Sequence, residues 1–480
     1  MELSDENGTH FFECFISGFT DPDGFCFFGA RRFSSKGLSF LISGQTGGTI
    51  LLTDQLAENI VQGKTSGDLK FKLIQRGLGK IYNSREAVTA KEQPLPCYFL
   101  IDLTLNCVLR CCYCFRHLTN GKGTIPENTL NEICCYILGY CKKHSLRNIS
   151  IQAWGGEPTL AWQRIMQILR FFEGSGVKAV ICIETCGATL TEDMVRTVEK
   201  YDMRIGISID GPPDIHNSQR PFVSGEGSFQ AVKNGLALLR SNGINDFSSI
   251  TVITRKSVGR IREIIEYFTR ELKLRQFKFN LVKCHPGMKE DDLGVTVDET
   301  AVFAREMFRT MVQAHRVGFR AVETNIRIRI LNLLTHRPSS ICLSRGCHGG
   351  RKLISISSTG DIYTCDLSDA GDKPFGNIKD GRDLVELLTE AAKTHPFFQK
   401  REKASCASCP WFFFCRGGCT SSLRFSLGHY TKDIDECECA YNNIIYREII
   451  RLLIEDPDLV YSLAGKFPLR DENDESGWKG

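Results

Sequence analysis

Three closely spaced cysteines in the first quarter of the chain constrain its structure more than any other feature. Cys107, Cys111 and Cys114 have the spacing C-x3-C-x2-C. Three thiolates can hold three irons of a four-iron cube and leave the fourth iron open, whereas ordinary electron-transfer clusters are closed by four cysteines. The amino and carboxylate groups of an amino acid can chelate such an open iron. A chance cluster among the 22 cysteines and part of a zinc site are the alternatives.

A second group of cysteines lies in the last third of the chain. Cys347, Gly360 and Cys365 have the spacing C-x12-G-x4-C. A C-x2-C-x5-C-x3-C run follows, and one more cysteine comes after seventeen further residues: Cys406, Cys409, Cys415, Cys419 and Cys437. Pairs of this kind also suit tetrahedral zinc, but zinc alone would leave the upstream triplet unexplained.

Together the two groups resemble the signatures of radical S-adenosylmethionine (radical SAM) enzymes that carry a C-terminal SPASM domain. The first signature includes an aromatic residue before its last cysteine, which is Tyr113 here. The resemblance implies S-adenosylmethionine (SAM) and three [4Fe–4S] clusters as cofactors. The cluster on the upstream triplet would bind SAM, with Tyr113 as part of the SAM site, and the other two would be auxiliary.

The resemblance also implies the ligands of the two auxiliary clusters. Auxiliary cluster I would take Cys342, Cys347, Cys365 and Cys419. Auxiliary cluster II would take Cys406, Cys409, Cys415 and Cys437. Cys439 is a rival for the last of these positions, and the spacing favours Cys437.

The composition is that of an ordinary globular protein, with 42% hydrophobic and 24% charged residues. No apolar run approaches the length of a membrane span, and we see no export signal. The 60 basic and 56 acidic residues give a net charge of +4, which is too balanced to indicate nucleic acid or an anionic membrane as a partner. We therefore expect a cytoplasmic protein whose thiols are reduced.

Strand and helix patterns alternate through the middle of the chain. Strands are expected at residues 97–104, 148–154, 177–184, 204–210, 249–254 and 276–281, with helices of ten to fifteen residues between them. This alternation predicts βαβ units and a parallel sheet. Six such units match the partial (β/α)6 TIM-type barrel of the radical SAM family. We therefore predict an α/β fold with its active site at the C-terminal ends of the strands.

The remaining segments flank this barrel. We predict an N-terminal module at 1–95, the barrel at 96–320, the SPASM domain at 321–440, and a C-terminal helix with a disordered tail at 441–480. Strands at 38–43 and 48–53 and helices at 54–62 and 69–76 resemble the small winged-helix-like α+β modules that bind leader peptides. An exposed strand edge would take an extended peptide by β-addition. A structural cap on the barrel is the alternative.

A glycine-rich turn follows the second expected strand. Gly155, Gly156 and Glu157 resemble the family's GGE motif, which contacts the SAM amino group. Two glycines let the backbone approach a ligand closely, and a carboxylate can take up a cationic amine. Taken alone, Gly-Gly-Glu-Pro is also an ordinary turn.

Two later segments resemble other parts of a SAM site. Ser208, Asp210 and Arg220 match the fourth-strand segment that helps to hold the SAM carboxylate and ribose in the family. Asp-Gly is also a common turn, which is the alternative for Asp210. Cys186 stands where relatives carry the Asn of a Thr-Asn-Gly, so this chain departs from the family there.

A single acidic residue directly follows an expected cluster ligand. Asp366 comes after Cys365, and in anaerobic sulfatase-maturing enzymes an Asp at this position is the proposed base. Such a base would accept the proton that the substrate loses on oxidation. A solvated loop carboxylate, or a group that supports the cluster, is the alternative.

These features predict an oxidoreductase that modifies a peptide. The resemblance implies that a 5′-deoxyadenosyl radical takes hydrogen from a ribosomally made precursor peptide, and that a thioether or carbon–carbon cross-link forms. Flavodoxin or ferredoxin would supply electrons. The alternative within the family is a sulfatase-maturing enzyme that converts Cys or Ser to formylglycine. A non-catalytic, zinc-structured scaffold is the alternative from another class.

Overall fold

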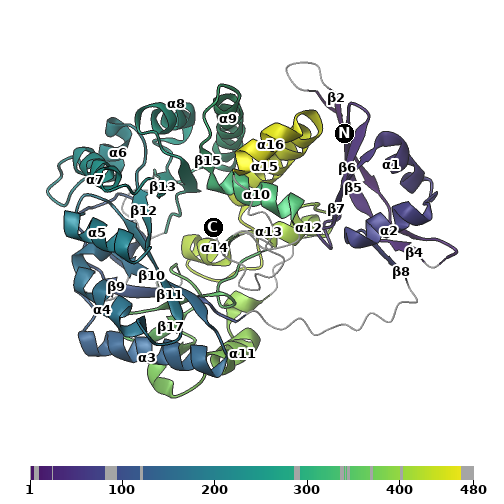
Figure 1. Cartoon of the computed structure of the whole chain (residues 1–480). Helices are drawn as coiled ribbons and strands as arrows, with labels where there is room; N and C mark the ends of the chain where they lie inside the picture. The colour runs from purple at the N-terminus through teal and green to yellow at the C-terminus, as the bar shows by residue number, and fades with distance from the viewer. Residues whose placement is uncertain are drawn as a thin grey trace.

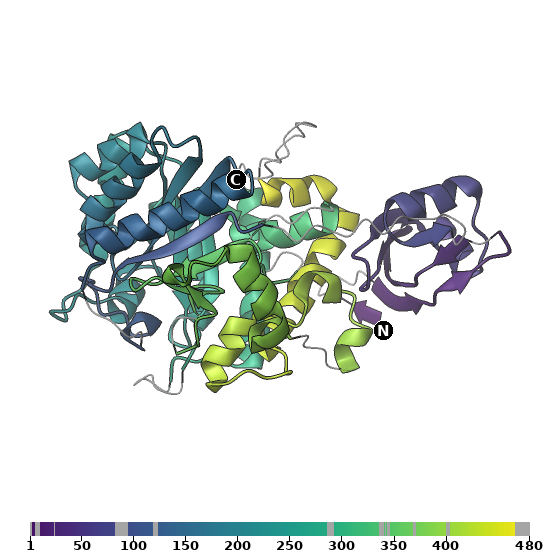
Figure 2. The ribbon, with the colours of Figure 1, turned by 90° about the horizontal axis from the view of Figure 1, so that it is seen from below.

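The computed structural model describes most of the chain, namely residues 2–4, 10–23, 25–81, 95–118, 123–285, 292–335, 340, 342, 346–367, 371–399 and 404–465. Figure 1 shows a barrel in blue and teal and a separate N-terminal module in purple. The yellow C-terminal helices lie between them in that view and in Figure 2, which is turned by 90°.

The barrel is built on six parallel strands in sequential order, as the sequence predicted. Each strand pairs in parallel with the next, and the sheet does not close on itself. The strands are β9 (Tyr98–Thr104), β10 (Asn148–Gly155), β11 (Lys178–Thr185), β12 (Arg204–Ser208), β13 (Ser248–Ile253) and β14 (Gln276–Leu281). A two-residue strand, β15 (Val322–Glu323), ends this side of the sheet. The predicted partial barrel is therefore confirmed.

The helices between these strands cover the outer face of the sheet. They are α3 (Glu127–Lys143), α4 (Trp162–Phe172), α5 (Glu192–Lys200), α6 (Pro213–Gln219), α7 (Phe229–Ser241) and α8 (Ile261–Glu266). On β11, Ile181 and Ile183 belong to the large core packed against these helices. Successive side chains of a strand point to opposite faces, so Cys182 and Glu184 point into the barrel.

The C-terminal part of the chain extends the barrel sheet beyond its first strand. β16 (Leu353–Ile356) pairs in parallel with β9, and β17 (Asp361–Tyr363) and β18 (Gly376–Asn377) follow in antiparallel order. The helices of this part are α9 (Val297–Arg316), α10 (Thr324–Leu334), α11 (Leu384–Thr394), α12 (Ala404–Ala407), α13 (Phe412–Cys415), α14 (Thr420–Leu427), α15 (Glu436–Glu455) and α16 (Pro457–Ala464). The predicted boundary at residue 440 falls inside α15, and the predicted tail lies mostly outside the described residues.

The N-terminal module is an α+β unit with more strands than the sequence predicted. An antiparallel sheet has the order β1 (Glu2–Ser4), β2 (His10–Ile16), β5 (Ala30–Ser35), β6 (Leu38–Ile42), β7 (Thr49–Thr53). A small second sheet contains β3 (Phe19–Thr20), β4 (Phe25–Phe27) and β8 (Gly79–Ile81). The predicted elements correspond to β6, β7, α1 (Asp54–Val61) and α2 (Gly67–Gln75), whereas the earlier strands and β8 were missed.

The module is packed against the C-terminal part of the chain. The ring of Phe33 stacks on the indole of Trp411, with 5.5 Å between the ring centroids. The hydroxyl of Thr49 donates a hydrogen bond to the carbonyl oxygen of Leu333 at 2.8 Å. These contacts give the module a fixed place beside the cysteine-rich segment.

No helix among the described residues is both long enough and apolar enough to cross a membrane.

Candidate functional site

The upstream cysteine triplet lies in the loop that follows β9, at the C-terminal ends of the barrel strands. The loop is held by backbone bonds, because Arg110 N–H donates to the carbonyl of Pro221 at 2.8 Å and Cys112 N–H to that of Gln219 at 2.9 Å. Burial raises the pKa of the Cys107 thiol to about 11. The backbone therefore fixes this loop against the end of α6.

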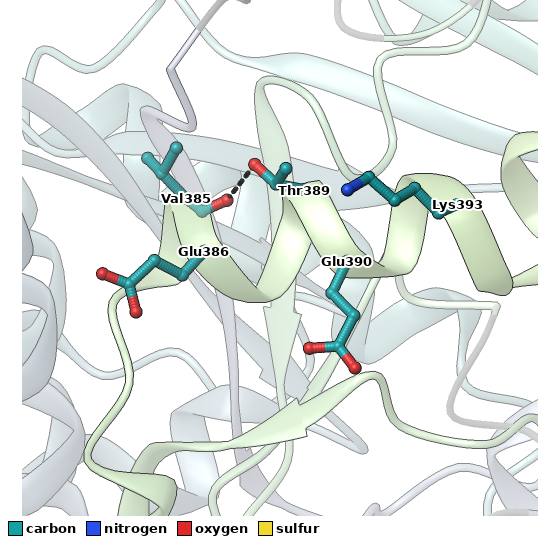
Figure 3. A pocket seen from close by; sticks show the side chains of 5 residues that line it. All are labelled: Val385, Glu386, Thr389, Glu390 and Lys393. Atoms are coloured by element: carbon teal, nitrogen blue, oxygen red, sulfur yellow. Dashed lines mark hydrogen bonds between the residues drawn. The ribbon is translucent and has the colours of Figure 1, made fainter.

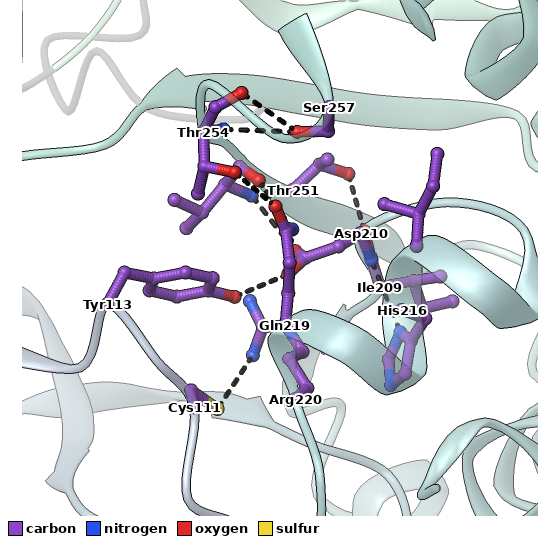
Figure 4. Close-up of polar contacts among 12 residues, drawn as sticks. Cys111, Tyr113, Ile209, Asp210, His216, Gln219, Arg220, Thr251, Thr254 and Ser257 are labelled. Atoms are coloured by element: carbon purple, nitrogen blue, oxygen red, sulfur yellow. Dashed lines mark hydrogen bonds and ion pairs between the residues drawn. The ribbon is translucent and has the colours of Figure 1, made fainter. Parts of the chain in front are cut away.

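Asp210 is the centre of a buried polar network beside this loop (Figure 4). Its Oδ2 accepts hydrogen bonds from the Tyr113 hydroxyl at 2.6 Å and from Gln219 Nε2 at 2.8 Å, and lies 3.0 Å from Arg220 Nε. Its Oδ1 accepts from Val252 N–H at 3.0 Å. Asp210 is fully buried, so its three hydrogen bonds and its ion pair hold Tyr113 and Arg220 in place; its expected contact with SAM stays a prediction.

Arg220 is thereby aimed at the cysteine loop. Its Nη1 lies 4.0 Å from the sulfur of Cys111, and its guanidinium lies over the ring of Tyr113 at 5.3 Å. The imidazole of His216 supports the same segment by accepting from Asp210 N–H at 3.3 Å and contacting Ser228 Oγ at 3.1 Å. Burial lowers the pKa of His216 to about 4, so this imidazole is neutral near pH 7.

The two glycines at the end of β10 are required by the cysteine loop itself. Gly155 has φ = +134°, and a Cβ there would lie 1.9 Å from the carbonyl oxygen of Thr104. A Cβ on Gly156 would lie 2.4 Å from that of Asn106. Gly156 N–H donates to the Thr104 carbonyl at 2.6 Å. The GGE turn and the start of the cysteine loop therefore form one closely packed unit.

Glu157 ties this unit to the end of β11. Its Oε1 accepts from the hydroxyls of Thr159 and Thr185, both at 2.6 Å, and its Oε2 accepts from Cys186 N–H at 2.8 Å. The carboxylate is almost completely buried. Cys186, which replaces the family's Asn, is also buried and contributes its backbone N–H. Ser208 ends β12 half-buried, and its hydroxyl makes no hydrogen bond within the described part of the chain.

Asp366 lies near the interior of the barrel. Burial raises the pKa of its carboxyl, and the charges of Arg116 and Lys278 lower it by less. Burial likewise raises the pKa of the Glu184 carboxyl and of the Cys342 thiol, and the ammonium of Lys278 opposes both shifts by less. The charge of Lys278 therefore acts on three groups: the carboxyls of Asp366 and Glu184 and the thiol of Cys342.

Glu184 is an interior residue that the sequence did not single out. Its register partner on β12 is Gly206, where a Cβ would lie 2.1 Å from the Glu184 carboxylate. Its Oε2 is buried and has no hydrogen-bond partner among the described residues. Burial raises the pKa of Glu184 to about 7. The inward position of residue 184 in the alternating β11 pattern was the signal that could have identified it.

The cysteines expected for auxiliary cluster I are brought together. Burial raises the pKa of Cys365, and the nearby thiols of Cys347 and Cys419 add to this. The Cys347 thiol likewise raises the pKa of Cys342. Cys365 Sγ contacts Ser421 Oγ at 3.0 Å. These sulfurs therefore share one buried region next to Asp366.

The cysteines expected for auxiliary cluster II line a small cavity, with one difference from the prediction. The cavity is lined by Cys406, Cys409, Cys415 and Cys439, together with Trp411, Asn442 and Asn443. The spacing favoured Cys437, but the sulfur of Cys437 lies 3.4 Å from the carbonyl oxygen of Val295. Spacing alone could not distinguish the two, because both residues lie in the first turn of α15.

The number and type of the donors agree with the iron–sulfur clusters that the sequence implies, although the described residues hold no group of three or more His, Cys, Asp or Glu placed to bind a single metal ion. Three thiols in the loop after β9 leave one position of a cube open, and each C-terminal set supplies four.

A different surface hollow lies along α11 and is lined by Val385, Glu386, Thr389, Glu390 and Lys393 (Figure 3). These five side chains belong to one exposed helix face, and we assign no site to them.

Comparisons with known proteins agree with this geometry. The model of the radical SAM superfamily matches residues 101–268, and that of an iron–sulfur cluster-binding domain named SPASM matches residues 347–410. The cysteine-type anaerobic sulfatase-maturating enzyme of Clostridium perfringens is 25% identical over 335 residues, which cover 65% of this chain and 86% of that protein. The mycofactocin maturase of Mycolicibacterium smegmatis is 23% identical, over 68% of this chain and 78% of that protein.

Two groups of solved structures share the fold. Native anSMEcpe with bound AdoMet and Cp18Cys peptide has a TM-score of 0.66 and 22% identity, covering 76% of this chain and 99% of that one. Streptococcus suis SuiB bound to precursor peptide SuiA has a TM-score of 0.51 and 17% identity, covering 83% of this chain and 96% of that one.

Proposed function

The chain is a radical SAM enzyme with a SPASM domain, and from this premise we propose that it installs a thioether or carbon–carbon cross-link in a ribosomally made peptide. The observation that carries the proposal is the N-terminal module, which a radical SAM barrel does not itself require. The module exposes large apolar side chains, among them Phe12 (49%), Phe15 (58%) and Phe71 (60%). We propose that these side chains contact the apolar part of a leader peptide.

An edge of the module's main sheet offers a way to bind the leader part of a precursor. β7 is the last strand of the sheet order, so one side of it pairs with no other strand among the described residues. An extended peptide can add to such an edge by main-chain hydrogen bonds. Leu51 on β7 is 41% exposed and would contact an apolar side chain of the peptide.

The cofactors of the enzyme are SAM and three [4Fe–4S] clusters, which supply hydrogen-atom abstraction and electron transfer when bound. We propose that Cys107, Cys111 and Cys114 hold the SAM cluster. The backbone at Gly155 and Gly156, with Glu157, would receive the SAM amino group. Tyr113, Ser208 and Arg220 would contact the remainder of SAM, and Asp210 would hold Tyr113 and Arg220 in place.

Asp366 is the proposed proton acceptor. A substrate carbon that has lost a hydrogen atom and then an electron leaves a proton to be removed when the new bond forms. Asp366 lies beside Cys365 at the edge of the barrel interior, and its raised pKa suits it to hold that proton.

A second candidate is the conversion of Cys or Ser to formylglycine in a sulfatase. The similarity to sulfatase-maturating enzymes of Clostridium perfringens and Bacteroides thetaiotaomicron favours it. The N-terminal module has no evident use in that reaction. In either case we propose a cytoplasmic enzyme that receives electrons from a flavodoxin or ferredoxin.

Product mass distinguishes the two reactions. The reconstituted enzyme would be incubated anaerobically with SAM, dithionite and, separately, a Cys-containing sulfatase peptide and a precursor peptide encoded beside its gene. A cross-link removes two hydrogen atoms and keeps the sulfur, whereas formylglycine formation from Cys removes the sulfur. Loss of sulfur from the sulfatase peptide, with the precursor peptide unchanged, would contradict the cross-linking proposal.

A further inference from the structure

Two cysteines lie in the first turn of α15, and their side chains point in different directions. Cys437 and Cys439 are two positions apart on α15, which begins at Glu436 and is capped by the side chain of Asp435. Two residues span about 200° around an α-helix, so the two thiols point to nearly opposite sides. At most one of them can face a given site on this helix.

The surroundings of the two thiols differ in kind. Cys439 lines the cavity that also contains Cys406, Cys409 and Cys415. The sulfur of Cys437 instead lies 3.4 Å from the carbonyl oxygen of Val295, beside the start of α9. Four thiols around one small cavity are the donor set of a closed cluster.

Asn443 adds a directed contact to the sulfur of Cys439. Its Oδ1 accepts from Trp411 Nε1 at 2.8 Å and from Arg447 Nη1 at 3.2 Å. Because two donors fix the oxygen, the Nδ2 group faces Cys439, where it lies 3.5 Å from the sulfur and 3.0 Å from the backbone carbonyl. Arg447 is itself held by Glu13 of the N-terminal module, with Nε to Oε2 at 3.0 Å.

We infer that Cys439, rather than the Cys437 indicated by spacing, completes auxiliary cluster II, and that Asn443 donates a hydrogen bond to this ligand. The inference rests on the proposed assignment of this cysteine set to a cluster. Hydrogen bonds to cluster sulfurs raise the reduction potential, so Asn443 is a positioning and tuning residue. Through Arg447, this tuning contact is linked to the N-terminal module.

Matched single variants test the inference without any peptide substrate. The full-length chain and its Cys439→Ala and Cys437→Ala variants would be reconstituted anaerobically with iron and sulfide, then compared by iron content, Mössbauer spectroscopy and EPR of the reduced protein. We expect Cys437→Ala to retain about twelve irons and unchanged spectra. Cys439→Ala should lose up to about four irons or show an altered signal from one cluster only.

Every outcome distinguishes the inference from the proposed function. A wild type that takes up no iron would contradict the proposed function itself. If wild type takes up its clusters, altered spectra in Cys437→Ala would overturn the ligand assignment. Unchanged iron content and unchanged spectra in Cys439→Ala would overturn it as well. If Cys439→Ala fails to fold, Cys439→Ser replaces it, since an oxygen ligand at this position must still change one cluster's EPR signal.

The Asn443 contact has its own readout. Asn443→Leu should keep its full iron content, while an EPR-monitored redox titration should show one cluster with a lower potential than in wild type. A potential unchanged from wild type would contradict the donated hydrogen bond.

Discussion

At the scale of single residues, the buried carboxylates decide how the site is held together. Asp210 is fully buried, accepts three hydrogen bonds and forms an ion pair with Arg220. Glu184 differs from Asp210, because one of its buried oxygens accepts no hydrogen bond from the described residues. One carboxylate therefore orients its neighbours, and the other keeps an oxygen without a hydrogen-bond partner among the described residues.

Replacing Asp210 tests its positioning role. Asp210→Asn removes the charge that holds Arg220 and leaves a buried guanidinium without its partner. We expect SAM affinity, measured by equilibrium dialysis on reconstituted protein, to fall by about ten- to a hundredfold with iron content unchanged. Asp214→Asn is the control, because Asp214 pairs with Arg260 at the exposed end of the same segment. Equal affinities in the two variants would refute the role.

Glu184 predicts a pH dependence of stability. Its pKa is about 7 in the fold against an ordinary value of 4.5. Between these values the unfolded chain loses the proton while the folded chain keeps it, so stability falls as the pH rises through this interval. Glu184→Gln cannot ionise, so its thermal midpoint should decline less than that of wild type between about pH 5 and about pH 7. Glu192→Gln, on the exposed face of α5, should follow wild type, and parallel curves for all three would contradict the shift.

At the scale of elements, the parallel strands were predictable and their supporting loops were not. Each of β9 to β14 is a short apolar run followed by a helical pattern, and this alternation is visible in the sequence. The strands before Leu38 were missed although β2 and β5 are longer than the predicted β6 and β7, because their pairing is set by the module's tertiary structure. Residues such as Gly155 looked like ligand contacts, whereas their first requirement is the close approach of the cysteine loop.

Gly155→Ala tests that requirement. The new Cβ would overlap the Thr104 carbonyl, and a φ of +134° is strained for alanine. We expect the upstream cluster to be lost and the auxiliary clusters kept, giving about eight irons rather than about twelve. Gly139→Ala is the control, because its Cβ in the middle of α3 meets nothing within 4 Å. Full iron content in Gly155→Ala would show that the loop adapts.

At the scale of the whole molecule, the three parts are connected through shared structure. β16 extends the barrel sheet by pairing with β9, so Cys365 lies near the barrel interior. Phe33 and Trp411 join the N-terminal module to the segment that carries Cys406 and Cys409. The cysteine spacing singled out two groups of thiols, but it could not predict the direction of a side chain on α15.

Phe33→Ala tests the connection between module and cluster segment. Phe33 is fully buried, and removing a buried phenylalanine costs about 3–5 kcal/mol. We expect a lower thermal midpoint and faster release of the module by a protease. Phe71→Ala, where the ring is 60% exposed, should change neither. Identical proteolysis of the two variants would mean that this contact does not hold the module.

The most direct test of the central claim is iron content measured together with SAM cleavage. After anaerobic reconstitution, the wild-type chain should hold about twelve irons and form 5′-deoxyadenosine from SAM and dithionite. The Cys107/Cys111/Cys114→Ala variant should hold about eight irons and form none. Zinc in place of iron, or no SAM cleavage by the loaded wild type, would contradict the assignment of radical SAM chemistry to this chain.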